Sequence, residues 1–360
     1  MTATATTRRC MTLAALGAAL LMATDAIAQE ACSSMQVLLS IAPKHREHVM
    51  EMIAPRLKEK LNVDLVTEAI GSVTMVERVT AQRANPRITI AQWDAPVGLT
   101  ACQTGLCKPI DLARAPNAAK LYDWAYTRNA QGQVMVMATN VLGVGFIYNE
   151  REFQRNRIAP PAAWADLTRP DLRGRLAITA PQSSMGTAAL VELARIGGGG
   201  ESNIEPGFVA TKAIMRNVHT VFTWTSELSN LLQLGEVWVA VTSSNIAPAL
   251  REQGIPMRFV LPREGSPTVN GGLSFVAGGP CEAAAYEYIN LYYSDEFQLR
   301  RMREGGTASP TTTSWPHLSA AERENMGVTA TDFDKLVNFD WNVINEARPG
   351  WIQRWQREIR

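Results

Sequence analysis

Apolar residues recur along this chain in two alternating patterns, short runs typical of buried strands and longer stretches with helical spacing. In the segment Arg46–Leu61, for example, Val49, Ile53 and Leu57 would share one face of a helix. The segments predicted for the first part of the chain are strand Val37–Ile41, helix Arg46–Leu61, strand Val63–Glu68, helix Thr74–Arg83 and strand Ile88–Ile90. This alternation predicts an α/β fold with parallel strands and helices on both faces. Ligands of such sheets bind beyond the carboxyl ends of the strands.

A second alternating series follows in the rest of the chain. Its predicted strands are Val134–Met137, Val144–Tyr148, Leu176–Thr179, Val218–Phe222, Val237–Val241, Phe259–Leu261 and Leu273–Ala277, and its helices include Phe208–Met215 and Cys281–Tyr293. The tail, residues 333–360, contains three tryptophans on either side of Pro349-Gly350. We expect the tail to form two helices that pack over the body.

One stretch combines a buried strand with a hydroxyl-rich helix start. After the predicted strand Leu176–Thr179 come Pro181, which favours a turn, and then Ser183, Ser184 and Thr187. The first N–H groups of a helix have no partner within it, so this turn could bind a small polar or anionic group. An ordinary capped helix is the alternative interpretation.

The N-terminus has the features of a secretory signal. Arg8 and Arg9 precede an apolar run from Met11 to Ala23, and Ala26-Ile27-Ala28 provides the small residues that a signal peptidase requires. We therefore expect residues 1–28 to be a signal peptide and the mature protein to be exported to the periplasm. The arginine pair is compatible with the twin-arginine route, and the Sec route stays open.

Composition and cysteine usage agree with an exported globular protein. Of the 360 residues, 46% are hydrophobic and 19% charged, and the net charge of +1 gives no reason to expect nucleic acid as a partner. Four cysteines follow the signal, which suggests disulfides in an oxidising compartment. Cys102 and Cys107 are close in sequence and form the preferred pair, which leaves Cys32 with Cys281. Free buried thiols are the alternative.

Several motifs together resemble a known family. The segment 160–167, PPAAWADL, followed by 172–178, LRGRLAI, is similar to a segment of bacterial extracellular solute-binding proteins in the spermidine/putrescine-binding branch. Further similar segments are 145–149, GFIYN, 235–238, GEVW, 262–265, PREG, and 355–359, WQREI. These proteins are the receptors of ABC importers. Each motif is weak alone, but together they cover nearly all of the mature chain in the order of the family.

The resemblance implies two Rossmann-like lobes joined by crossing hinge strands, the type II periplasmic binding fold, with the ligand between the lobes. Mapped onto this chain, the first lobe takes residues 30–140 and 265–305, and the second takes 141–264 and 306–360. Thr139-Asn140 and Asn270-Gly271-Gly272 fall where the chain would cross, and these residue types suit a hinge. The implied function is solute capture and delivery to an inner-membrane permease by a monomer, without a cofactor or a catalytic residue.

The loops that would border the cleft contain the expected ligand-binding residues. They are Lys44, Ser72, Trp93, Asp94, Ser183, Ser184, Met185, Gly186, Thr187, Trp224, Glu227, Ser244, Asn245 and Asn270. By similarity to the polyamine branch, Trp93 and Trp224 would be aromatic walls, and Asp94 and Glu227 would face ammonium groups. Core packing is the alternative for both tryptophans, and capping of the following helix is the alternative for Asp94.

The charges in these loops leave the solute open. Few of the residues are acidic, and Lys44 together with the helix start at 183–187 would favour an anion. A polyamine-like or zwitterionic amine is the favoured class, and a carboxylate or phosphonate anion is the alternative. Ferric iron would require clustered tyrosines, whereas Tyr292-Tyr293 at a helix end is better explained by packing.

Enzyme motifs are weak in this sequence. His45 and His48 would share one side of a helix but lack the HExxH order and a third ligand, so no metal site is predicted. Ser183 and Ser184 are not in a G-x-S-x-G turn, and no motif links them to a histidine. A secreted hydrolase is therefore only a remote alternative, and a periplasmic sensor or chaperone with the same fold is a third.

Overall fold

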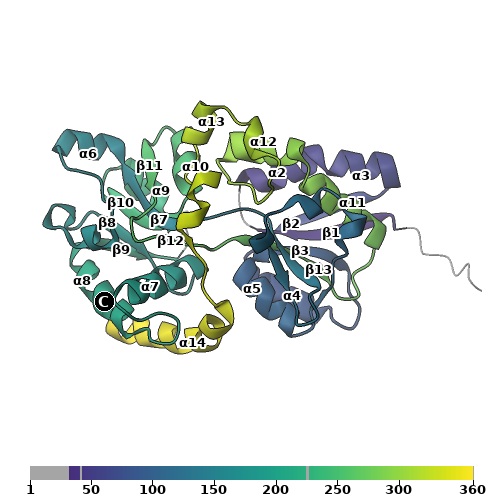
Figure 1. Ribbon diagram of the computed structural model, residues 1–360, viewed down its shortest axis with the longest axis horizontal. Helices are drawn as coiled ribbons and strands as arrows, with labels where there is room; N and C mark the ends of the chain where they lie inside the picture. Colours follow the sequence, from purple (N-terminus) through teal and green to yellow (C-terminus); the bar gives the residue numbers. More distant parts are fainter. Residues whose placement is uncertain (1–31, 41–42, 224–226, 360) are drawn as a thin grey trace, which may run out of the picture.

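The computed structural model describes residues 32–40, 43–223 and 227–359. Its strands form two large sheets, and helices cover both, so the molecule has two α/β lobes side by side (Figure 1). We call the body built on the sheet of β1 (Ser34–Leu39) the first lobe and the body built on the sheet of β7 (Val144–Asn149) the second lobe. The predicted α/β class with two lobes is confirmed. The predicted signal peptide, residues 1–28, lies outside the described residues.

The sheet of the first lobe has the order β2-β1-β3-β13-β6-β5, with β4 paired to β13. Strand β1 is parallel to β2 and β3, whereas β13 runs antiparallel to β3 and β6. The bounds of the other strands are β2 Asp64–Ala69, β3 Ile88–Asp94, β4 Cys107–Lys108, β5 Tyr126–Arg128, β6 Val134–Ala138 and β13 Gly271–Val276.

Helices cover both faces of this sheet because consecutive residues of β1 point to opposite sides. Val37 and Leu39 pack with α2, α3 and α11, and Leu38 packs on the other face with α4 and α5. All three side chains are fully buried. The helices of this lobe are α2 Pro43–Met52, α3 Ala54–Leu61, α4 Ser72–Ala81, α5 Ala95–Gln103, α11 Glu282–Tyr292 and α12 Asp295–Gly305.

Two helices, α2 and α3, occupy the segment in which the sequence predicts one. The chain turns at Ile53, and Pro55 lies in the first turn of α3. A proline there loses no helical hydrogen bond, whereas the same ring inside a continuous helix would clash with the preceding turn. The apolar spacing from Val49 to Leu57 therefore identified the buried face correctly but not the break.

The sheet of the second lobe has the order β11-β7-β10-β8-β9. Strand β8 is parallel to β9 and β10, whereas β7 is antiparallel to β10 and β11. The other strands are β8 Leu176–Thr179, β9 Val218–Phe222, β10 Val239–Ser243 and β11 Met257–Val260. The helices are α6 Glu150–Asn156, α7 Ser184–Ile196, α8 Glu205–Ile214, α9 Leu228–Gln233 and α10 Ile246–Glu252.

The chain crosses between the sheets at residues 139–143 and 268–270, and hydrogen bonds hold these two crossings together. Thr139 N–H donates to Gly271 O at 2.9 Å, and Leu142 N–H donates to the Asn270 side-chain oxygen at 3.1 Å. Gly143 also forms a bridge with Thr268. The predicted hinge residues thus lie next to one another, while the exact lobe limits stay predictions.

The segment after α12 contacts both lobes. Thr311 pairs with Leu121 of the first lobe, and the Arg251 side chain of the second lobe donates to Asn325. Val141 of the crossing packs in a small core with Trp315. The segment contains α13 (Ala320–Glu324) and β14 (Leu336–Val337), and β14 pairs with β12 (Ser266–Pro267) beside the second crossing.

The tail ends in one helix, α14 (Trp341–Glu358), and the prediction of two helices is wrong. Pro349 lies inside α14, where it removes one backbone hydrogen bond. Ile344 before the proline and Trp351 and Trp355 after it are all buried in the core of the second lobe. Because both halves are held against the same surface, the proline does not divide the helix.

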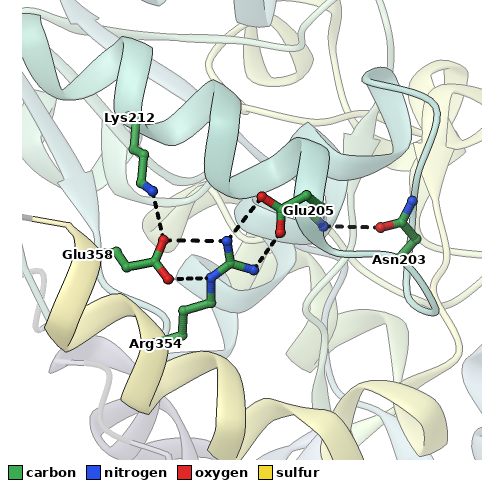
Figure 2. A network of polar contacts seen from close by, with 5 residues as sticks. All are labelled: Asn203, Glu205, Lys212, Arg354 and Glu358. Carbon is green, nitrogen blue, oxygen red and sulfur yellow. Dashed lines mark hydrogen bonds and ion pairs between the residues drawn. The ribbon is translucent and has the colours of Figure 1, made fainter.

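A cluster of charged residues also anchors α14 to α8, as Figure 2 shows. The Arg354 guanidinium donates to Glu205 of α8 and to Glu358, and it lies 4.1 Å from the centre of the Phe208 ring. Lys212 of α8 donates to the second oxygen of Glu358 at 2.7 Å. Hydrogen bonds from Arg354 and Lys212 lower the pKa of Glu358 to about 2, so this carboxylate is charged throughout the physiological range.

Two disulfides lie in the first lobe. One joins Cys102 at the end of α5 to Cys107 of β4, and the other joins Cys32 to Cys281 at the start of α11. These are the pairs that the cysteine positions favoured, and the free-thiol alternative does not apply to them.

Within the described residues, no helix has both the length and the apolar character required to cross a membrane.

Candidate functional site

Asp94 and Ser184 meet where the two lobes face each other. Asp94 is the last residue of β3 in the first lobe, and Ser184 is the first residue of α7 in the second. The Ser184 hydroxyl donates to Asp94 Oδ2 at 3.3 Å, and the Asp94 N–H donates to the Ser72 hydroxyl at 2.9 Å. Carboxyl ends of strands and N-termini of helices are the positions at which α/β proteins bind ligands. The two predicted residues therefore come together at a suitable point.

The Asp94 carboxyl group lies in an environment that disfavours its charge. Burial raises its pKa, and the hydrogen bond from Ser184 and the positive charge of Arg348 oppose this rise. Although Asp94 precedes α5, its side chain makes no capping hydrogen bond to that helix. The side chain is thus directed to the lobe junction, and the capping alternative does not apply.

Arg348 of α14 is the residue at this junction that sequence reasoning missed. Its guanidinium donates to the carbonyl oxygens of Pro181 at 3.2 Å and Gln182 at 2.8 Å, in the turn before α7. Burial lowers the pKa of Arg348, and the Asp94 charge acts in the opposite direction. Within the described part of the chain, the two groups attract each other without forming an ion pair. Opposite charges are thus held apart at the junction.

The turn before α7 is built by the residues that were expected to bind ligand. The Ser183 hydroxyl accepts a hydrogen bond from Gly186 N–H at 3.0 Å and donates to Ala180 O at 3.1 Å. Thr187 is fully buried, and its hydroxyl donates to Pro181 O at 2.7 Å. A Cβ atom on Gly186 would lie 2.1 Å from Ala180 O, so only glycine fits there. These three residues shape the turn and position Ser184, while Met185 packs against the core of the second lobe.

The interpretation of Trp93 as an aromatic wall is wrong, because the side chain is fully buried in the first lobe. Its indole N–H donates to the Ser274 hydroxyl at 3.3 Å, and a Cβ atom on Gly98 would lie only 2.2 Å from the indole nitrogen. Trp93 is thus a core residue, as the alternative interpretation held. Trp224, the second proposed wall, lies outside the described residues.

Three more predicted residues lie at or near the crossing. The Ser244 hydroxyl accepts a hydrogen bond from Gly143 N–H at 3.3 Å, and Asn270 accepts one from Leu142 N–H. The Asn245 side chain accepts a hydrogen bond from the neighbouring Ser243 hydroxyl at 2.8 Å. These contacts support the crossing and the start of α10.

The Lys44 side chain is engaged by residues of both lobes. Lys44 Nζ forms an ion pair with Glu252 of α10 at 2.7 Å and donates to Glu304 O at 3.0 Å. Its charge is thereby neutralised by the opposite lobe. Glu227 is exposed at the start of α9. The ligand-binding role of Glu227 stays a prediction.

The two histidines of α2 have separate structural partners. His45 Nε2 lies 2.6 Å from Gln92 Oε1, and Gln92 in turn donates to the Tyr288 hydroxyl. Burial lowers the pKa of His45 to about 3, so this ring is neutral. His48 pairs instead with Glu304. The described residues contain no cluster of histidines, cysteines and carboxylates that could hold a metal ion.

The Ser184 hydroxyl donates its hydrogen bond to the carboxylate of Asp94 and not to a histidine.

Comparison with known proteins gives one family and many similar folds. Residues 51–325 match the family described as bacterial extracellular solute-binding protein. An uncharacterized protein of Haemophilus influenzae is 25% identical over 314 residues, which cover 84% of this chain and 85% of that protein.

Two solved structures illustrate the fold. The periplasmic binding protein AfuA from Actinobacillus pleuropneumoniae, with bound fructose-6-phosphate, superposes with a TM-score of 0.70 at 22% identity over 91% of this chain and 98% of that one. The spermidine/putrescine substrate-binding protein PotD from Streptococcus pneumoniae superposes with a TM-score of 0.73 at 13% identity over 90% and 99%. At these identities the likeness shows the fold alone.

Proposed function

Because the chain belongs to the bacterial extracellular solute-binding proteins, we propose that it is the periplasmic receptor of an ABC importer. It captures a small polar organic solute between its lobes and delivers the solute to an inner-membrane permease. The favoured solute is a polyamine-like or zwitterionic amine. No bond is made or broken in this cycle, and the protein acts by binding and closing around its solute.

The observation that carries this proposal is the pair of separated charges at the lobe junction. The Asp94 carboxylate and the Arg348 guanidinium are both partly removed from water and do not satisfy each other as an ion pair. A guanidinium has five N–H donors, of which two are used by the Pro181 and Gln182 carbonyls. An ammonium group beside Asp94 and a carboxylate beside Arg348 would complete both sets of interactions. Between the favoured classes, this arrangement supports the zwitterion.

Closure follows from the division of the site between the lobes. Asp94 belongs to the first lobe, and Ser184 and the turn held by Arg348 belong to the second. A solute that contacts both groups can do so only while the lobes are together. Binding therefore shifts the equilibrium between the open and closed forms towards the closed form. The size of the shift is set by the ratio of the solute's affinities for the two forms.

A carboxylate or phosphonate anion is the second candidate. The N-terminus of α7, a helix of 13 residues, adds positive potential to that of Arg348. Protonation of Asp94, which its raised pKa favours, would remove the one opposing charge. An anion would thus bind in the same place with Asp94 as a hydrogen-bond donor.

Three four-carbon solutes distinguish these classes: putrescine with two ammonium groups, 4-aminobutyrate with one of each charge, and succinate with two carboxylates. We expect saturable calorimetric binding to be strongest for 4-aminobutyrate. Asp94→Asn should weaken binding of both amines at least tenfold, which is about 1.4 kcal/mol. Arg348→Gln should weaken 4-aminobutyrate and leave putrescine nearly unchanged.

Glu59→Gln on the exposed face of α3 is the matched control, because it also removes one carboxylate. It should leave all affinities unchanged. If succinate alone binds, the solute is an anion and the amine proposal is wrong. If Asp94→Asn and Glu59→Gln behave alike, Asp94 does not contact the solute.

A further inference from the structure

A cavity lies beside the crossing, on the side of α5. Its volume is about 130 Å³. Its walls come from α5, from β5 with the two residues Trp124 and Ala125 before it, and from β6 in the first lobe, from Thr268 and Asn270 of the crossing, and from Asn338, Phe339 and Trp341 around the start of α14. Figure 1 shows α14 reaching from the second lobe to α5, and Asn345 fixes this approach by donating to Pro96 O at 3.1 Å. We call this space the hinge cavity.

Three aromatic side chains, Trp124, Phe339 and Trp341, form part of the wall. Trp124 stacks on Tyr122 with a centroid distance of 5.8 Å, and Phe333 contacts both rings edge-on. These neighbours fix the indole of Trp124, although 38% of its surface is exposed. A preformed aromatic surface of this kind favours a flat or ring-shaped occupant.

The hinge cavity contains side-chain donors with no partner among the described residues. The Asn270 side-chain oxygen accepts from Leu142 N–H, and the Asn338 side-chain oxygen accepts from the Thr268 hydroxyl at 2.7 Å. With their oxygens engaged, both asparagines have NH₂ groups left to donate. Of the described residues that line the cavity, none carries a charge. An occupant should therefore offer acceptors and be uncharged, because a buried charge without a counter-charge is costly.

We propose that the hinge cavity is an accessory binding site for an uncharged ring that carries a carbonyl oxygen. The ring would lie against Trp124 and Trp341, and the carbonyl would accept from Asn270 or Asn338. This site goes beyond the receptor function proposed above: Asn270 is the one lining residue that was also expected to bind the solute, and Asp94, Ser184 and Arg348 are not part of the lining.

Occupation of this site would be coupled to the arrangement of the lobes. The cavity has walls from the first lobe, from the crossing and from the start of α14, whose later turns are anchored in the second lobe. A compound that contacts all three favours the arrangement in which they lie together. By linkage, the compound in the hinge cavity changes the protein's affinity for the transported solute by a certain factor. The solute changes the protein's affinity for that compound by the same factor.

Three pyridines of one shape test the chemistry: nicotinamide is neutral with a carbonyl, nicotinate is anionic, and 3-(aminomethyl)pyridine is cationic. Saturation-transfer NMR on the full chain should show nicotinamide binding at least tenfold tighter than either charged analogue. Trp341→Leu should abolish this binding, whereas Trp341→Phe should retain it. Asn338→Asp, at an exposed position, replaces donors by a carboxylate and should reverse the preference towards the cationic analogue.

Glu59→Gln, on the exposed face of α3, is the control and should leave nicotinamide binding unchanged. An equal loss of nicotinamide binding in Glu59→Gln and in Trp341→Leu would overturn the assignment to the hinge cavity. Equal binding to wild type and to both Trp341 variants would place the compound elsewhere and also overturn the proposal, as would the absence of any saturable signal. None of these outcomes depends on which solute the receptor transports.

Discussion

Lys44 Nζ lies 2.7 Å from Glu252 Oε2, and this ion pair joins α2 of the first lobe to α10 of the second. The two side chains are 43% and 42% exposed, so water screens their attraction. Lys44 was expected to attract an anionic solute. Its position instead indicates that it stabilises the contact between the lobes.

Replacing Lys44 by methionine should weaken closure slightly. An exposed pair of this kind contributes about 0.5 kcal/mol, so the dissociation constant of the solute should rise about twofold. The effect should grow at low ionic strength and vanish in high salt. Calorimetry at two salt concentrations measures both changes. Lys58→Met is the control, because its partner Asp64 lies 3.0 Å away in the same lobe. If the two variants bind alike, the Lys44 pair does not favour closure.

The Asp94 carboxyl group should reduce stability at neutral pH. Its pKa in the folded protein is raised above the ordinary value of 3.8. As the pH rises through 3.8, the unfolded chain therefore ionises first and gains stability relative to the folded protein. Above the raised pKa, this loss of folding stability is complete. Asp94→Asn should thus be more stable than wild type at pH 7, and the difference should shrink as the pH falls towards 3.8.

Urea unfolding of both proteins between pH 4 and pH 7 measures this difference. Asp94→Asn keeps an oxygen for the Ser184 hydroxyl, so the contact between the lobes can persist. A difference in unfolding free energy that is independent of pH would show that the Asp94 carboxylate is well solvated in the folded protein.

The two disulfides should differ in their contributions to stability. They close segments of very different length, with sequence separations of 249 for Cys32–Cys281 and 5 for Cys102–Cys107. Loop-closure entropy predicts about 5 kcal/mol for the long loop and about 2 kcal/mol for the short one. Urea unfolding of the Cys32→Ser, Cys281→Ser protein and of the Cys102→Ser, Cys107→Ser protein tests this order. The reverse order would mean that the unfolded chain keeps residual structure near Cys32 and Cys281.

The β8–α7 segment shows what local sequence determines here. Strand Leu176–Thr179 has the predicted bounds, and Ser183 caps the helix that follows. Each of these features depends on neighbours in the chain: an apolar run, a proline in the turn and a hydroxyl at the cap. The position of Ser184 at the lobe junction follows from the general rule for helix N-termini in α/β folds.

Trp93 and Arg348 show what local sequence could not determine. The predicted strand Ile88–Ile90 ended before Trp93, whereas β3 continues to Asp94. Gln92 is buried within it because His45 and Tyr288, distant in sequence, satisfy its amide. Pro349 suggested a break beside Arg348, but packing of the tail on the second lobe keeps α14 continuous. In both cases tertiary contacts outweighed the local signal.

The central position of β13 has a consequence for the order of folding. This strand lies between β3 and β6, yet it is made long after both of them during synthesis. All strands of the second sheet, from β7 to β11, precede β13 in the chain. A polypeptide that emerges N-terminus first can therefore complete the second sheet while the first still lacks its middle strand. The sheet of the first lobe, although it begins earlier in the sequence, is therefore completed after the sheet of the second lobe.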